Sequence, residues 1–133
     1  MNPTIELRMP ATPEFVSLLR TISGAAAARS DLTIDLLDDS KIACSEAAIL
    51  LINNAGADAD FSWSWACHTG RLDIRASLPT HLTELPDFSS MDGFTWIVLS
   101  AVSKNLMVEL VGGFLVIEFS IFELGIFDSM TEP

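Results

Sequence analysis

The sequence has 133 residues, enough for one folded domain with its own core, so we expect a single domain over residues 1–133. Its 18 acidic and 7 basic residues give a formal net charge of -11, which argues against direct nucleic-acid binding. The two cysteines, Cys44 and Cys67, lack C-x-x-C spacing and are typical of buried free thiols in a reducing compartment. Charged residues interrupt both apolar ends of the chain. The sequence therefore predicts no secretion signal and no membrane span, and we expect a cytoplasmic protein.

The first half of the chain predicts one strand and two helices. Residues 5–9 alternate apolar and charged side chains, as in a strand with one covered face. Thr12-Pro13-Glu14 predicts the start of a first helix. Residues 32–37 form a connector, or another short helix, before a long central helix. We expect that helix to begin at Asp38-Asp39-Ser40, to stop at Gly56 in a left-handed conformation, and to be covered on most sides.

The second half predicts two hairpins with a helix between them. The strands of the first hairpin are residues 61–67 and 71–76, the helix covers 94–105, and the second hairpin joins 107–111 to 114–122. Residues 78–91 contain two prolines and predict a loop. This order predicts a two-layer α/β sandwich, in which three helices cover one face of a mixed, mainly antiparallel sheet.

A carboxylate lies within the central helix. At about 100° per residue, Glu46 shares one helical face with Ile42, Ile49, Leu50 and Asn53. One interpretation places the Glu46 carboxylate in water at the edge of this apolar stripe, or in contact with a neighbouring polar group. The other interpretation is that Glu46 lines a pocket.

The histidines and tryptophans do not form a sequence pattern that indicates a metal site or a binding surface. His68 and His81 have no metal-ligand spacing, and we expect no metal site. Trp63, Trp65 and Trp96 occupy alternating or helical positions, which favours the core over a binding surface, although indoles are also enriched at interfaces.

Four pieces of the sequence, taken in order, resemble the anti-sigma-factor serine-protein kinases of the RsbW and SpoIIAB type, members of the GHKL (Bergerat-fold) ATPase superfamily. They are residues 5–11 with the following Leu19-Arg20, Ser45-Glu46-Ala47, residues 93–102, and residues 112–117. The resemblance covers about residues 5–122 and implies a GHKL-like fold.

The resemblance also implies a nucleotide site, which this chain matches only in part. The family motif is Glu-Ala-x-x-Asn, in which the Glu acts as general base and the Asn holds magnesium. Glu46 and Ala47 match, but Leu50 stands at the Asn position and has no oxygen for a hard cation. Asn53 lies a further turn along the helix, about 4.5 Å of rise beyond Leu50.

Two more family motifs are missing. The Asp-x-Gly-x-Gly segment that reads adenine is replaced by residues 77–81, which contain neither Asp nor Gly, and the glycine-rich lid is reduced to Gly93. We therefore expect a vestigial nucleotide pocket and no cofactor, with ATP and magnesium bound only if the pocket still functions. Its residues by this alignment are Glu46, Leu50, Asn53, Leu78, Asp92 and Gly93.

Three hypotheses for function follow from the resemblance. The first is an anti-sigma-factor-like regulator that acts by protein–protein binding to a sigma factor or to an anti-sigma-factor antagonist. We expect it to be a homodimer, with the first strand as a pairing element if that strand lies at a sheet edge. The second is an active ATP-dependent serine-protein kinase that uses Glu46 as its catalytic residue. The third is a non-catalytic dimeric subunit with no link to sigma factors.

Overall fold

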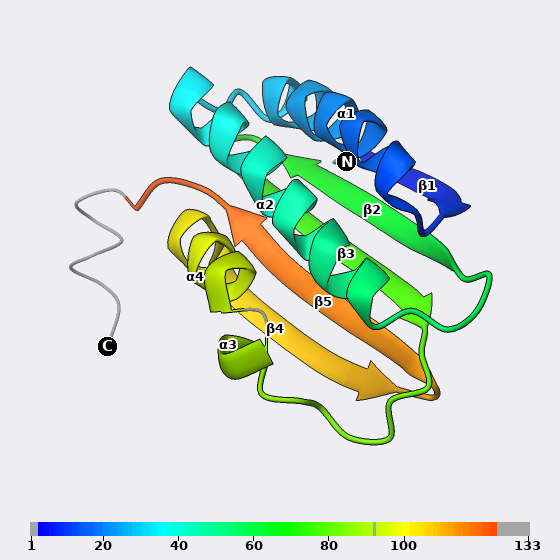
Figure 1. Cartoon of the computed structure of the whole chain (residues 1–133). Helices are drawn as coiled ribbons and strands as arrows, with labels where there is room; N and C mark the ends of the chain where they lie inside the picture. Colours follow the sequence, from blue (N-terminus) through cyan, green and yellow to red (C-terminus); the bar gives the residue numbers. More distant parts are fainter. Residues whose placement is uncertain (1–2, 92, 125–133) are drawn as a thin grey trace.

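Five strands form one sheet in the order β1-β2-β3-β5-β4, and the helices lie on one face of it (Figure 1). This computed structural model describes residues 3–91 and 93–124. The predicted two-layer sandwich is confirmed and is consistent with a GHKL-like fold. All four pairings among the described strands are antiparallel, so the expected parallel component is absent from them. The strands are β1 (Thr4–Pro10), β2 (Asp60–His68), β3 (Arg71–Pro79), β4 (Lys104–Val111) and β5 (Phe114–Ile121).

Three long helices cover the sheet, as the sequence predicts. They are α1 (Val16–Arg29), α2 (Ile34–Asn53) and α4 (Gly93–Val102), and a 3-10 turn, η1 (Pro13–Phe15), precedes α1. The predicted loop over residues 78–91 also contains a short helix, α3 (Phe88–Met91). It forms because the buried Phe88 stacks on Trp96 of α4, with ring centroids 6.0 Å apart. That contact between two segments is not visible as a local pattern.

The boundaries of α2 differ from the prediction. The helix begins at Ile34, where the Thr33 hydroxyl accepts a hydrogen bond from the backbone N–H of Leu36 at 3.2 Å. Residues 34–37 of the predicted connector are therefore the first turn of α2, and the helix does not begin at Asp38-Asp39-Ser40. The expected stop at Gly56 is also wrong, because the positive-φ glycines of the described chain are Gly70, Gly112 and Gly113.

The core lies between the helices and one face of the sheet. On β2 the alternation places Phe61, Trp63 and Trp65 on the covered face, where all three are buried. The indole N–H of Trp65 donates a hydrogen bond to the hydroxyl of Ser23 on α1 at 3.0 Å, which fixes α1 over β2. The prediction that these tryptophans belong to the core is confirmed for Trp63 and Trp65, whereas Trp96 is only half-buried.

None of the described helices covers the opposite face of the sheet (Figure 1). Its arginines each contact a carboxylate: Arg8 contacts Asp60 at 3.3 Å, Arg71 contacts Asp73 at 2.8 Å, and Arg75 contacts Glu118 at 3.4 Å. Two open hollows of about 590 and 400 Å³ lie among these strands. No helix within the described residues combines the length and apolar character that crossing a membrane requires.

Candidate functional site

Helix α2 carries half of the residues of the predicted pocket, and it is the middle helix of its layer, between α1 and α4 (Figure 1). The sheet lies beneath it, and its fourth side faces outward. Ile42 and Ile49 lie on that outward side, and Ile49 is 39% exposed. The expectation that α2 is covered on most sides is therefore confirmed, and this outward side is the exception. Glu46 is half-buried between the two isoleucines along the helix.

Leu50 lies one turn beyond Glu46 but points into the core. It is fully buried and belongs to the same apolar cluster as Leu78 of β3, Leu99 of α4 and Leu115 of β5. Leu78 is fully buried as well. Aliphatic side chains thus fill the position that the family alignment assigns to the magnesium ligand and the second position of the segment aligned with the adenine-reading motif. A buried leucine does not fit a magnesium ion, which requires oxygen ligands.

The end of α2 is held against the end of β3. The Thr80 hydroxyl donates to the Asn54 carbonyl at 2.6 Å, and the Gly56 N–H donates to the Pro79 carbonyl at 3.0 Å. These bonds bring the region of Asn53 near that of Leu78. Asn53 itself is exposed at the last position of α2, so the structure does not place its amide in the core beside Leu50.

Gly93 is the first residue of α4, and nothing around it requires a glycine. A methyl group added there would find no atom of residues 3–91 or 93–124 within 4 Å, and its backbone is not left-handed. A phosphate-cradling loop, by contrast, needs glycines so that the backbone can approach the ligand closely. Asp92, the remaining predicted residue, lies outside the described residues.

Two serines near Glu46 are already engaged. The Arg20 side chain of α1 donates to the Ser45 hydroxyl at 2.7 Å, and that hydroxyl donates to the Lys41 carbonyl at 2.9 Å. The Ser40 hydroxyl donates to the Leu37 carbonyl at 2.7 Å. These hydroxyls therefore join helix to helix or cap a turn, and neither is positioned as a nucleophile.

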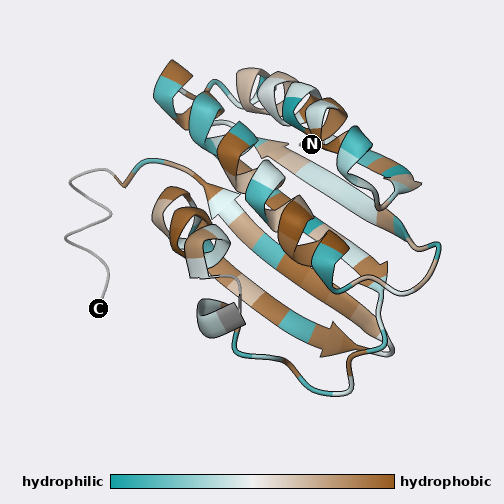
Figure 2. Cartoon of the chain, in the orientation of Figure 1, coloured by the Kyte–Doolittle hydropathy of each residue, from teal (hydrophilic) through white to brown (hydrophobic). Residues whose placement is uncertain are grey.

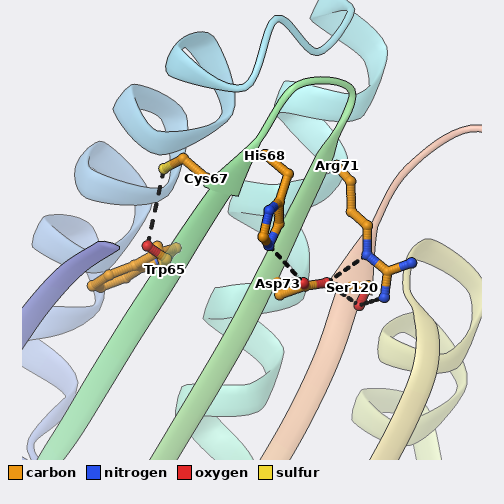
Figure 3. Close-up of polar contacts among 6 residues, drawn as sticks. All are labelled: Trp65, Cys67, His68, Arg71, Asp73 and Ser120. Atoms are coloured by element: carbon orange, nitrogen blue, oxygen red, sulfur yellow. Dashed lines mark hydrogen bonds and ion pairs between the residues drawn. The ribbon is translucent and has the colours of Figure 1, made fainter. Parts of the chain in front are cut away.

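The structure shows a polar cluster that sequence reasoning did not identify (Figure 3). On the uncovered face of the sheet, Asp73 of β3 accepts hydrogen bonds from the Ser120 hydroxyl at 2.6 Å and from Arg71 at 2.8 Å. His68 lies 3.1 Å from its other carboxylate oxygen. Strand alternation placed Asp73 on a polar position, but the contact with Ser120 depends on the β3–β5 register, in which the two residues are direct partners.

The electrostatics of this cluster stabilise a charged carboxylate. Partial burial raises the pKa of Asp73, but hydrogen bonds from Ser120 and Arg71, together with the charges of Arg71 and His68, outweigh it and leave the pKa lowered. Because Ser120 donates to the aspartate and not to the histidine, the arrangement does not activate a serine nucleophile. The cluster therefore joins β2, β3 and β5 through charge-assisted hydrogen bonds.

Neither metal nor thiol chemistry is supported in the described part of the chain. Within residues 3–91 and 93–124, no three His, Cys, Asp or Glu side chains come together as a metal site. Cys44 and Cys67 are both free and buried, as predicted. Burial raises the pKa of the Cys44 thiol to about 12, so it is protonated and unreactive at neutral pH.

Comparison with curated proteins finds relatives named serine-protein kinase RsbW. The serine-protein kinase RsbW of Listeria monocytogenes serovar 1/2a is 31% identical over 80 residues, which cover 58% of this chain and 51% of the Listeria protein. The serine-protein kinase RsbW of Staphylococcus aureus strain JH9 is 41% identical over 51 residues, covering 38% of this chain and 32% of that protein. The match thus spans about half the length of the first of these relatives. No protein-family model matches the chain.

Proposed function

The chain is a relative of the RsbW serine-protein kinases, as its sequence predicts, and from this relationship we propose that it is an anti-sigma-factor-like regulator that acts by binding proteins. The proposal includes a degenerate nucleotide site. The observation that carries it is the position of Leu50, which is fully buried in the core where the family places a magnesium ligand. The proposal places the protein in the cytoplasm with its partners.

The nucleotide part of the proposal is tested by calorimetry with magnesium and ATP. We expect no binding at micromolar concentrations, because the magnesium position offers no oxygen and Gly93 belongs to no glycine-rich loop. Glu46→Ala should then behave like the wild type. Glu84→Ala, at an exposed position outside α2, is the matched control for the loss of one negative charge.

A second candidate function is supported by the names of the relatives. If the chain is an active serine-protein kinase, Glu46 would act as the general base with metal ligands other than those of the family. That function predicts micromolar binding of magnesium–ATP which Glu46→Ala abolishes and Glu84→Ala preserves. This result would overturn the proposal of a degenerate site while leaving the family relationship intact.

The protein partner is tested with purified sigma factors and anti-sigma-factor antagonists of the host. We expect one of them to bind the full chain, with an affinity that falls as salt is added, because a net charge of -11 steers a basic partner. Failure of every sigma factor and every antagonist to bind would count against this function. It would favour the third hypothesis, a subunit without a sigma-factor link.

We also propose that the protein forms a homodimer through β1, which lies at the edge of the sheet. The Ala11 N–H donates to the Ala59 carbonyl, and the Cys67 N–H donates to the Pro3 carbonyl. Because hydrogen-bonded pairs alternate in an antiparallel ladder, the odd-numbered residues of β1 bond to β2. The backbone groups of Thr4, Glu6 and Arg8 therefore point to the free edge.

The charges on β1 select one register for self-pairing. A two-fold pairing centred on Leu7 places Glu6 opposite the partner's Arg8, and Arg8 opposite the partner's Glu6. A pairing centred on Glu6 or on Arg8 would place like charges opposite each other, which is unfavourable. Leu7, which is half-buried, would be covered further by Leu7 of the second copy. These features support a continuous sheet across two copies of the chain.

Charge reversal separates this dimer from other arrangements. Glu6→Arg should shift the protein toward monomer in sedimentation velocity, because two pairs of arginines would then face each other. The double variant Glu6→Arg/Arg8→Glu should restore the dimer. Glu14→Arg, which makes the same charge change at an exposed residue of η1, is the control. A dimer that survives Glu6→Arg would show that β1 is not the interface.

A further inference from the structure

The outward side of α4 exposes large apolar side chains. Phe94 is 77% exposed and Ile97 is 67% exposed, and Ala101 completes a stripe at the i, i+3, i+7 spacing of one helical face. The opposite side of the helix carries the buried Leu99 and the half-buried Trp96, so it already provides the contact with the core. Figure 2 shows α4 as one of the most apolar segments of the helical layer. We call Phe94, Ile97 and Ala101 the α4 stripe.

Carboxylates lie near both ends of α4. Near the C-terminal end of α4, Lys104 interacts electrostatically with Asp39 of α2, which brings the acidic turn of Asp35, Asp38 and Asp39 close to that end. At the other end, α3 packs on α4 through the stack of Phe88 on Trp96, and the exposed Asp87 directly precedes α3. Among the described residues, Lys104 is a cation that lies near Asp39.

The uncovered face of the sheet is different, because its three arginines are paired with Asp60, Asp73 and Glu118. The acidic first turns of α2 have no ion pair of that kind among the described residues. Asp35, Asp38 and Asp39 therefore add negative charge to the helical side, close to an exposed apolar surface. A surface with these two properties is complementary to a partner that is both apolar and basic.

We propose that the α4 stripe is the docking surface for an amphipathic basic helix of the protein partner. The proposal rests on the proposed function, because it names the part of the chain that would hold that partner. Phe94 and Ile97 would insert between apolar residues of the partner helix, and lysines or arginines on its flanks would approach Asp38, Asp39 and Asp87. In recognition of this kind the bound amphipathic helix presents anchors at i, i+3 and i+7 spacing, and these would pack against the exposed side chains of the α4 stripe.

The test uses the full chain and a fluorescently labelled peptide of roughly 18 leucine and lysine residues, long enough to form an amphipathic helix. A peptide with glutamate in place of lysine is the charge control. Fluorescence anisotropy should show binding of the lysine peptide alone. The double variant Phe94→Ser/Ile97→Ser should weaken that binding by about 30-fold, the loss expected when anchors of a binding surface are removed.

Ile34→Ser is the matched control, because Ile34 is 78% exposed and lies next to Asp35 on α2. It removes an exposed isoleucine from an acidic neighbourhood without changing charge, so binding should stay within about twofold of the wild type. Equal binding by the wild type and the double variant would overturn the proposal, as would an equal loss in Ile34→Ser. The first result would mean that the peptide is attracted by charge alone, and the second that it contacts exposed apolar side chains without preference for the α4 stripe.

The same variants separate this inference from the proposed function. If a sigma factor or antagonist binds the wild type and the double variant equally, the function stands and the α4 stripe is not its docking surface. If binding of the lysine peptide depends on Phe94 and Ile97 while no sigma factor or antagonist binds, the proposed function is wrong. The assignment of the α4 stripe as a docking surface then still stands.

Two other occupants of the α4 stripe, a second copy of the chain and the chain's own C-terminal sequence, would give different results in these experiments. If a second copy covers the stripe, the double variant will convert a dimer into a monomer in sedimentation velocity. If the chain's own C-terminal sequence covers it, Phe127→Ser will strengthen peptide binding. Either outcome would overturn the proposal. The exposed position of both substituted side chains predicts an unchanged melting temperature, which is measured first to verify that the variants are folded.

Discussion

The role of Leu50 as a core residue can be measured directly. Leu50→Asn would recreate the family motif Glu-Ala-x-x-Asn at the position where the structure shows a fully buried leucine. Loss of the leucine side chain from a packed core costs about 2–5 kcal/mol. A buried amide without partners adds about 1–3 kcal/mol. We therefore expect Leu50→Asn to lower the free energy of unfolding by about 3–8 kcal/mol, which is a large part of the ~5–15 kcal/mol typical of a domain.

Ile49→Asn is the matched control, because it introduces the same side chain one residue earlier. Ile49 is 39% exposed, so the amide can reach water and the expected loss is at most about 1 kcal/mol. Urea unfolding followed by far-UV circular dichroism measures both variants. If Leu50→Asn is as stable as Ile49→Asn, position 50 is not fixed in the core and the reasoning fails. If the variant gains magnesium-dependent ATP binding, the rest of the pocket is intact, contrary to the proposed degeneracy.

Three further predictions concern other parts of the fold. Both thiols, Cys44 and Cys67, should fail to react with a thiol reagent at pH 8 in the folded protein and should react fully in urea; a reactive thiol in the folded state would contradict their burial. Because the folded pKa of Asp73 is lowered, its contribution to stability is present above its unfolded pKa and is lost as the pH falls through the folded value. Urea unfolding of Asp73→Asn should show a deficit of about 1 kcal/mol or less at pH 7 that disappears in strong acid; a deficit that persists there would exclude an electrostatic origin. Gly93→Ala should leave the melting temperature unchanged or raise it slightly, since alanine is the better helix former and has open space there; a large decrease would reveal a contact that the structure does not show.

The sequence predicted the layer architecture because alternation and helical spacing are local patterns. The start of α2 was placed too late because Asp38 and Asp39 resemble capping residues as well as Thr33 does. The helix extends to Thr33 because Leu36 and Leu37 pack against the core, which is a tertiary contact. Helix α3 was missed for a similar reason, since it depends on the stack between Phe88 and Trp96.

The candidate site was only partly accessible from the sequence. The sequence shows that Leu50 differs from the asparagine of the family motif. Its burial could not be predicted, because it results from the packing of α2 against the sheet. The polar cluster around Asp73 could not be found, because Ser120 is distant in the chain and becomes its neighbour only through the register of β3 and β5. The α4 stripe was also missed: the helix is apolar on nearly every side, so its sequence does not indicate which side faces outward.

The stack of Trp96 on Phe88 has a practical consequence. Trp63 and Trp65 are enclosed and stacked on each other at 5.9 Å, so their emission should remain constant while the fold is intact. Trp96 is half-buried on the same short helix as Phe94 and Ile97. A shift in the wavelength or lifetime of tryptophan emission would therefore report changes around α4, which gives the unlabelled protein an optical signal of its own.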